Sequence, residues 1–109
     1  MKKIINGVRY DTEKAVLVGE ADNLHRGVSS SSDFAYWEAA LYRTQRSGRY
    51  FLAGKGGPMS RFSQSVGQNS WGGGSDLIPM SKEEALAWAE QHLDVDEIEE
   101  HFADVIEDA

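Results

Sequence analysis

The residue types of a hydrolytic triad occur together in one short segment, where His25 and Asp33 flank the serine run Ser29–Ser32. Serine hydrolysis needs a hydroxyl activated by an imidazole, which a carboxylate must in turn orient. The segment lacks the strand-turn-helix elbow that presents such a serine. Consecutive serines are more typical of an exposed loop. The sequence therefore predicts no catalytic residue here and no enzyme activity.

Metal-site chemistry has equally little support. The chain contains no cysteine, which excludes disulfides, thiol catalysis and cysteine-ligated metals. His92 and His101 lie nine positions apart across an expected helix break, a spacing that matches no common zinc site even if Asp94 or Glu97 added a ligand. His92 is explained more simply as a favourable residue at the C-terminal end of a helix. We predict no metal and no cofactor.

The stretch GKGGPMS, residues 54–60, is the nearest approach to a phosphate-binding loop. It lacks the GxxxxGK[ST] spacing, and no apolar strand followed by a long helix surrounds it. A glycine-rich turn is the better interpretation, so no nucleotide site is predicted.

Acidic residues concentrate at the end of the chain. Residues 83–109 hold eleven Asp and Glu and no Lys or Arg, and the whole chain has a formal net charge of −7. Residues 1–75, by contrast, hold ten Lys and Arg against six acids. Such asymmetry indicates either a solvated face that aids solubility or a surface for a basic partner.

Asp96, Glu100, Asp104 and Asp108 recur every four residues. On one helix, this spacing places carboxylates in a row about 6 Å apart. The separation is comparable with that of phosphates along a DNA strand, so the row could mimic DNA in a basic groove. The candidate partner-binding residues are Asp96, Glu97, Glu99, Glu100, Asp104, Asp108 and Trp71.

Trp71 stands in the glycine-rich stretch NSWGGGS. Exposed tryptophans often anchor protein interfaces. The interpretation that we favour at this stage is a flexible loop in which Trp71 folds back over the core, and the exposed anchor is the alternative.

A second candidate surface is the basic and aromatic segment 42–62. Lysine and arginine can bind nucleic-acid backbones while aromatic rings stack on bases. The acidic pI of about 4.8 opposes that interpretation, and direct DNA binding is not expected. The residues concerned are Arg43, Arg46, Arg49, Lys55 and Arg61, with Tyr42, Tyr50, Phe51 and Phe62.

Strand signals dominate residues 1–79. Asn6-Gly7 predicts a two-residue hairpin turn, and residues 15–21 are expected to form a strand. Gly48 indicates the turn of a second hairpin, between residues 36–44 and 49–54. The segment from Asp33 could alternatively begin as a helix. A short helix is expected from Met59 to about Gly67, followed by a short edge strand that Pro79 ends.

Helix signals dominate residues 80–109. Ser81 with Glu84, and Asp94 with Glu97, are capping pairs that start two helices. An apolar stripe from Val95 to Ile106 suits packing on a sheet. We predict a single α+β domain, residues 1–109, with a small antiparallel sheet of about four or five strands, a short central helix and two C-terminal helices packed on it.

Targeting signals are not evident. The N-terminal apolar run is only Ile4-Ile5, too short for a signal peptide, and no stretch approaches the roughly twenty apolar residues of a membrane span. A cytoplasmic protein without membrane contacts is expected.

Four motifs together resemble a family of small proteins carried by phages, plasmids and integrative elements of bacteria. They are NGVRYDT, LYRT, YFLAGKGG and EEALAWAE, and the similarity covers nearly the whole chain. Some members of that family are connected with inhibition of CRISPR–Cas systems.

The resemblance implies a small non-enzymatic inhibitor in the cytoplasm of the host bacterium. Its partner would be a Cas effector protein or complex with a basic nucleic-acid-binding surface, and it would block nucleic-acid access. The alternative is an accessory nucleic-acid-binding or regulatory module of a mobile element that acts through segment 42–62.

Overall fold

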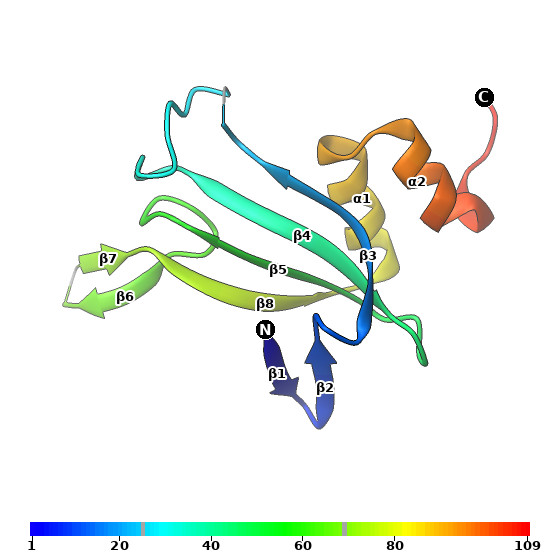
Figure 1. The fold of residues 1–109 in the computed structure, drawn as a ribbon, viewed down its shortest axis with the longest axis horizontal. Helices are drawn as coiled ribbons and strands as arrows, with labels where there is room; N and C mark the ends of the chain where they lie inside the picture. The colour runs from blue at the N-terminus through cyan, green and yellow to red at the C-terminus, as the bar shows by residue number, and fades with distance from the viewer. Residues whose placement is uncertain (25, 69) are drawn as a thin grey trace.

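A four-stranded antiparallel sheet forms the centre of the protein. A computed structural model describes residues 1–24, 26–68 and 70–109 and measures 45 × 36 × 21 Å. The sheet order is β3-β4-β5-β8, so β3, β4 and β5 follow the chain order and β8 pairs with β5 (Figure 1). The strands are β3 (Ala15–Asp22), β4 (Trp37–Thr44), β5 (Tyr50–Gly56) and β8 (Gly74–Met80). The hairpin β6 (Gln64–Gly67) and β7 (Ser70–Gly72) is inserted between β5 and β8.

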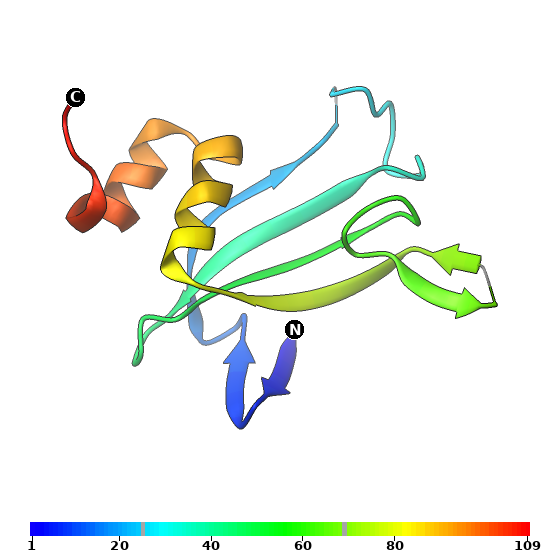
Figure 2. The same ribbon diagram turned by 180° about the vertical axis from the view of Figure 1, so that it is seen from behind.

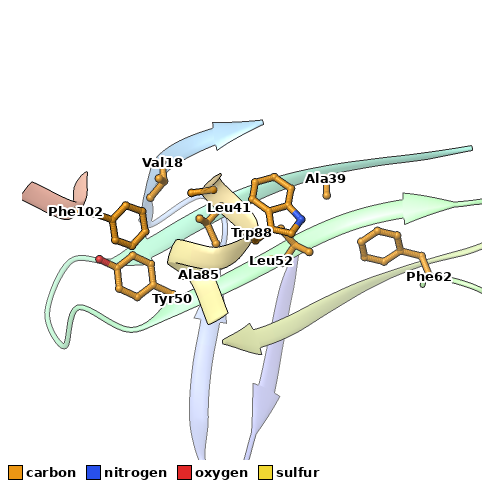
Figure 3. Packing of buried hydrophobic residues seen from close by; sticks show 10 residues of the cluster. Val18, Ala39, Leu41, Tyr50, Leu52, Phe62, Ala85, Trp88 and Phe102 are labelled. Atoms are coloured by element: carbon orange, nitrogen blue, oxygen red, sulfur yellow. The ribbon is translucent and has the colours of Figure 1, made fainter. Parts of the chain in front are cut away.

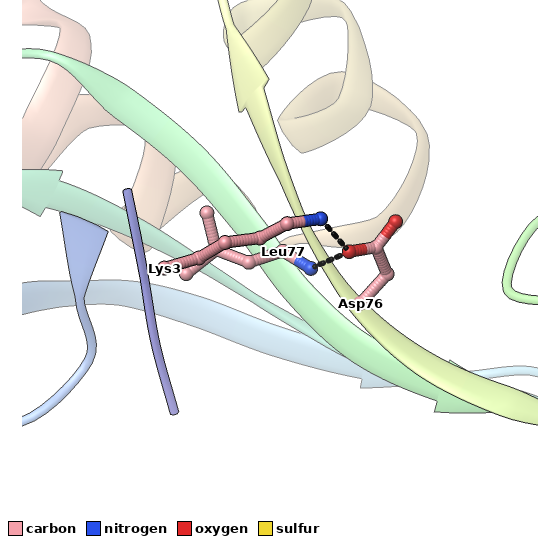
Figure 4. A network of polar contacts seen from close by, with 3 residues as sticks. All are labelled: Lys3, Asp76 and Leu77. Carbon is pink, nitrogen blue, oxygen red and sulfur yellow. Dashed lines mark hydrogen bonds and ion pairs between the residues drawn. The ribbon is translucent and has the colours of Figure 1, made fainter. Parts of the chain in front are cut away.

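The N-terminal hairpin pairs β1 (Lys2–Ile5) with β2 (Val8–Asp11). Its turn confirms the predicted use of Asn6 and Gly7, since their φ angles are 52° and 79°. The hairpin packs through Tyr10 against Phe51 and Leu77 of the sheet. Lys3 Nζ adds a 2.7 Å ion pair to Asp76, whose same oxygen accepts the Leu77 backbone N–H (Figure 4).

Two helices lie on the other face of the sheet (Figures 1 and 2). They are α1 (Lys82–His92) and α2 (Val95–Phe102), followed by a 3₁₀ turn, Ala103–Val105. Both predicted capping boxes are present. Glu84 N–H donates to Ser81 Oγ at 3.1 Å, and Glu97 N–H donates to Asp94 Oδ1 at 2.9 Å.

Successive side chains of β5 point to opposite faces of the sheet and contribute to a hydrophobic core on each face. Tyr50 and Leu52 face the helices, whereas Phe51 faces the N-terminal hairpin. Figure 3 shows the larger core, in which Phe102 stacks on Tyr50 with ring centroids 5.3 Å apart. Its other buried members are Val18, Ala39, Leu41, Phe62, Ala85, Trp88 and Ala89. The predicted α+β class, with two C-terminal helices on an antiparallel sheet, is confirmed.

The predicted short central helix is wrong. Residues 58–62 form turns, and β6 follows where the helix was expected. Long-range backbone bonds decide this conformation, because Gly57 N–H donates to Tyr36 O and Met59 N–H to Phe34 O, each at 2.8 Å. Phe62 is thereby buried in the core.

Two further boundaries differ from the expectation. The segment around Trp71 is a strand, β7, rather than a loop, and β8 begins at Gly74 and includes Pro79. Pro79 is tolerated because β8 is an edge strand. Within the described residues, no helix has the length and apolar character that a membrane crossing requires.

Candidate functional site

The acidic residues gather around α2 and the chain end, at one end of the long axis (Figure 1). Tight packing holds α2 in place, since a Cβ on Gly19 of β3 would lie 2.7 Å from Leu93 Cδ1 and 2.8 Å from Glu97 Oε2. A side chain at Gly19 would therefore displace the ends of the Leu93 and Glu97 side chains where the start of α2 crosses β3. The capping box also uses Glu97, which accepts the Asp94 N–H at 3.4 Å. Glu97 is consequently a structural residue as well as an acidic one.

The predicted row of four carboxylates does not exist as one helical row. Asp96 and Glu100 share α2, but the helix ends at Phe102, so Asp104 lies in the 3₁₀ turn and Asp108 in the non-helical chain end. A helix continuing to Asp108 would have placed several acids at its negative C-terminal end, which is unfavourable. Regular DNA-like spacing is therefore a wrong prediction for this segment.

Asp104 has a partner within the chain. Its carboxylate binds Lys82 Nζ and so joins the chain after α2 to the first turn of α1. The hydrogen bond from Lys82 lowers the pKa of Asp104 and keeps the carboxylate ionised. Asp104 thus contributes less net negative charge to the surface than its neighbours.

Five of the exposed carboxylates at this end take part in neither the Asp94 capping box nor the Lys82–Asp104 pair: Asp96, Glu99, Glu100, Glu107 and Asp108. Glu100 lies 3.8 Å from His101 Nε2. Among the described residues, none of the five pairs with a lysine or arginine. We call these five residues the acidic end. Val95, Val105 and Ile106 are also exposed here, so the predicted apolar stripe is buried mainly at Phe102.

Trp71 does not fold back over the core, contrary to the favoured interpretation. Its side chain is 63% exposed on β7, opposite Ser65 of β6. The glycines that follow Trp71 let the backbone of this hairpin lie close to the backbone at the end of β5. A Cβ on Gly73 would lie 2.8 Å from Gly56 O. Phe34, Met59 and Val66 are also exposed.

In the basic and aromatic segment 42–62, the aromatic rings pack into the protein whereas the basic side chains are exposed. The side chains of Tyr50, Phe51 and Phe62 are buried in the cores, and Tyr42 stacks on Phe51 with ring centroids 5.3 Å apart. The three buried rings are unavailable for stacking on bases, and Tyr42 is half-buried. The five basic residues are exposed.

A polar cluster missed by the sequence analysis lies on the sheet face opposite the helices. Tyr36 Oη donates to Glu38 Oε2 at 2.6 Å, and Lys55 Nζ lies 3.3 Å from Glu38 Oε1. Asp22 is the cross-strand partner of Glu38, so like charges oppose each other on adjacent strands. The spacing of Tyr36 and Glu38 in an expected strand was the available signal.

In this cluster, a neutral phenol and an ammonium group both contact one ionised carboxylate. The hydrogen bond to Glu38, with burial, raises the pKa of Tyr36 to about 12. The same bond lowers the pKa of Glu38. Neither group titrates near neutral pH, so the pair lacks a group poised for proton transfer. An open pocket of about 790 Å³ adjoins it.

The other sequence candidates are dispersed. Of the residues with triad chemistry, His25 lies outside the described residues. Ser30 and Ser32 hydrogen-bond each other at 2.9 Å, and Asp33 accepts the Ala35 N–H. His92 is packed between Trp37 and Trp88, and burial lowers its pKa, so a charge–dipole role is weak. The described residues contain no group of three potential metal ligands.

Comparisons with protein-family models, with curated proteins and with solved structures found no match to this chain.

Proposed function

We propose that this protein is a small non-enzymatic inhibitor of a bacterial defence system. Its target is a Cas effector complex in the cytoplasm of the host bacterium, where it obstructs access of nucleic acid. The family resemblance of the NGVRYDT, LYRT, YFLAGKGG and EEALAWAE motifs suggests the target class. The observation that carries the mechanism is the acidic end, whose carboxylates are exposed and not neutralised by lysine or arginine among the described residues.

Competition for a basic groove does not require a regular row of charges. A concentrated negative field attracts a positive groove over roughly a Debye length, about 8 Å at physiological salt. Charge complementarity then raises the association rate and fixes orientation. The broken row therefore changes the proposed mechanism from a geometric copy of DNA to electrostatic occlusion.

Trp71 provides a second contact in this proposal. The β6–β7 hairpin that carries it lies at the opposite end of the long axis from the acidic end (Figures 1 and 2). A large exposed aromatic side chain supplies the apolar anchor that an acidic surface lacks. The two contacts are therefore separable by mutation.

The test is a binding assay against purified Cas effector complexes of several types, with and without loaded guide RNA. Glu99→Lys with Glu100→Lys reverses two charges of the acidic end, and Glu13→Lys with Glu20→Lys makes the same net change at exposed positions elsewhere. We expect only the first pair to weaken binding, and added salt to weaken wild-type binding.

Equal loss in both double variants would show a nonspecific charge effect and contradict the assignment of the acidic end. Absence of binding to every Cas complex would refute the proposed target. The alternative, a nucleic-acid-binding module, predicts retention of the wild-type protein on DNA at low salt through Arg43 to Arg61. The buried rings of that segment disfavour this outcome.

A further inference from the structure

A small notch opens between the sheet and α1, away from the acidic end and from Trp71. It has a volume of about 170 Å³ and is lined by Trp37, Ala39, Leu52, Arg61, Trp88 and His92. Figure 3 shows Trp88 of α1 above Leu52 and beside Ala39. The walls are therefore two indoles and two aliphatic side chains, and an imidazole and a guanidinium supply the polar groups.

Two indole rings fix the imidazole of His92. Its ring centroid lies 4.9 Å from that of Trp37, in an edge-on arrangement, and 4.9 Å from that of Trp88. Trp88 and His92 are one helical turn apart on α1, so they share a face of that helix. The imidazole consequently has little freedom to turn toward another partner.

His92 Nδ1 is buried, and no hydrogen-bond partner for it is found among the described residues. Buried polar atoms are nearly always paired, so this atom indicates a missing partner. A water molecule needs two to four polar contacts and occupies about 30 Å³. The notch is much larger than that and mostly apolar, so a polar group carried on an apolar body fits it better.

The charges that act on His92 are positive, although the whole protein is acidic. Burial is the main cause of the lowered pKa of His92, and the positive charges of Arg26 and Arg61 lower it further. Arg61 also acts on Glu84, one helical turn before Trp88, but it forms no ion pair within the described residues. An anion at the notch would therefore be favoured by both arginines.

We propose that this notch binds a small planar carboxylic acid, with its ring against Trp37 and Trp88 and its carboxylate held by His92 and Arg61. A cavity of about 150 Å³ accommodates benzene, so one aromatic ring fills the available volume. Guanidinium binds carboxylate through paired hydrogen bonds, and a neutral imidazole can donate from Nδ1. Phosphate lacks the apolar body that the indole walls require. The proposal is independent of the proposed Cas target.

Benzoate is the probe, and NMR of the isolated protein is the measurement. We expect saturable shifts of the His92 imidazole and of the Trp37 and Trp88 indole N–H signals, with a dissociation constant in the millimolar range. The exposed Trp71 indole is an internal control that should not move. Bound carboxylate should also raise the pKa of His92, because it favours the imidazolium form.

Two ligand controls and one variant pair separate the contributions. Benzyl alcohol keeps the ring without the charge, and inorganic phosphate keeps the charge without the ring; neither should saturate the site as benzoate does. Arg61→Gln should weaken benzoate binding about tenfold, whereas Arg49→Gln, at an exposed position in the β4–β5 turn, should leave it unchanged. Equal binding of benzyl alcohol, no effect of Arg61→Gln, or no shift at His92 would each overturn the proposal.

Discussion

Tyr36, just before β4, and Glu38, within β4, form a hydrogen bond of 2.6 Å between Tyr36 Oη and Glu38 Oε2. The phenol is buried, with 6% of its surface exposed, whereas the side chain of Glu38 is 45% exposed and also pairs with Lys55. The bond therefore orients a charged group at the boundary between core and solvent. It holds Glu38 on a strand where Asp22 opposes it with the same charge.

Removing this bond should lower stability modestly. We expect Tyr36→Phe to reduce the free energy of unfolding by about 1 kcal/mol, near the lower end for bonds to charged groups because water screens the exposed carboxylate. Tyr42→Phe is the matched control, since no hydrogen bond of the Tyr42 hydroxyl is found in the described part of the chain. Urea unfolding of both variants measures the difference. Equal losses would show that the Tyr36 hydroxyl has no special role.

The same pair makes stability depend on pH at both extremes. The pKa of Glu38 is lowered in the folded state, so its contribution is complete above the ordinary value of 4.5 and disappears as pH falls through the folded pKa. The pKa of Tyr36 is raised from 10.0 to about 12, so its contribution is complete below pH 10 and disappears as pH rises toward 12. The stability difference between wild type and Tyr36→Phe should therefore be largest between these limits.

Ultraviolet titration of tyrosinate gives an independent check of that prediction. The chain contains four tyrosines, and we expect the Tyr36 phenol to ionise near pH 12. Tyr36→Phe should remove this late step. A late step that persists in the variant would assign the raised pKa to another tyrosine.

Local signals predicted the parts of the fold that depend on neighbouring residues. The Asn6-Gly7 turn and both capping boxes need only a few consecutive side chains, and the structure has all of them. Two of the failed predictions, the central helix and the carboxylate row, depend on distant contacts. Pairing with residues 34–36 prevents a helix at Met59, and the Lys82–Asp104 pair lies beyond the end of α2.

The candidate sites follow the same division. The acidic composition of the chain end was readable from sequence, but its arrangement depended on where α2 ends. The placement of the β6–β7 hairpin that carries Trp71 depends on a distant contact, the close approach of Gly73 to Gly56 at the end of β5. The His92 notch brings together residues from β4, β5, α1 and the segment before β6. No local pattern brings those segments together, because only the sheet topology does.

Gly57 should tolerate no side chain. Its added Cβ would lie 2.3 Å from Phe34 O, a backbone atom that cannot move aside cheaply. We expect Gly57→Ala to lower the free energy of unfolding by about 1–3 kcal/mol, as overpacking commonly does. Gly67→Ala is the control, since the nearest atom to its added Cβ is 3.9 Å away. Similar thermal unfolding of both variants would contradict the close backbone packing of the loop.

Phe102 should be the main anchor of the acidic end. Its side chain is fully buried and stacks on Tyr50, whereas Val105 after it is 45% exposed. We expect Phe102→Ala to lower the free energy of unfolding by about 3–5 kcal/mol, and Val105→Ala to change it little. Hydrogen exchange should show lost protection in α2 first. If the acidic end binds a Cas complex, Phe102→Ala should also weaken binding, because its carboxylates would no longer be held against the sheet. Binding that survives the loss of α2 protection would place the contact elsewhere, with Trp71 as the next residue to test.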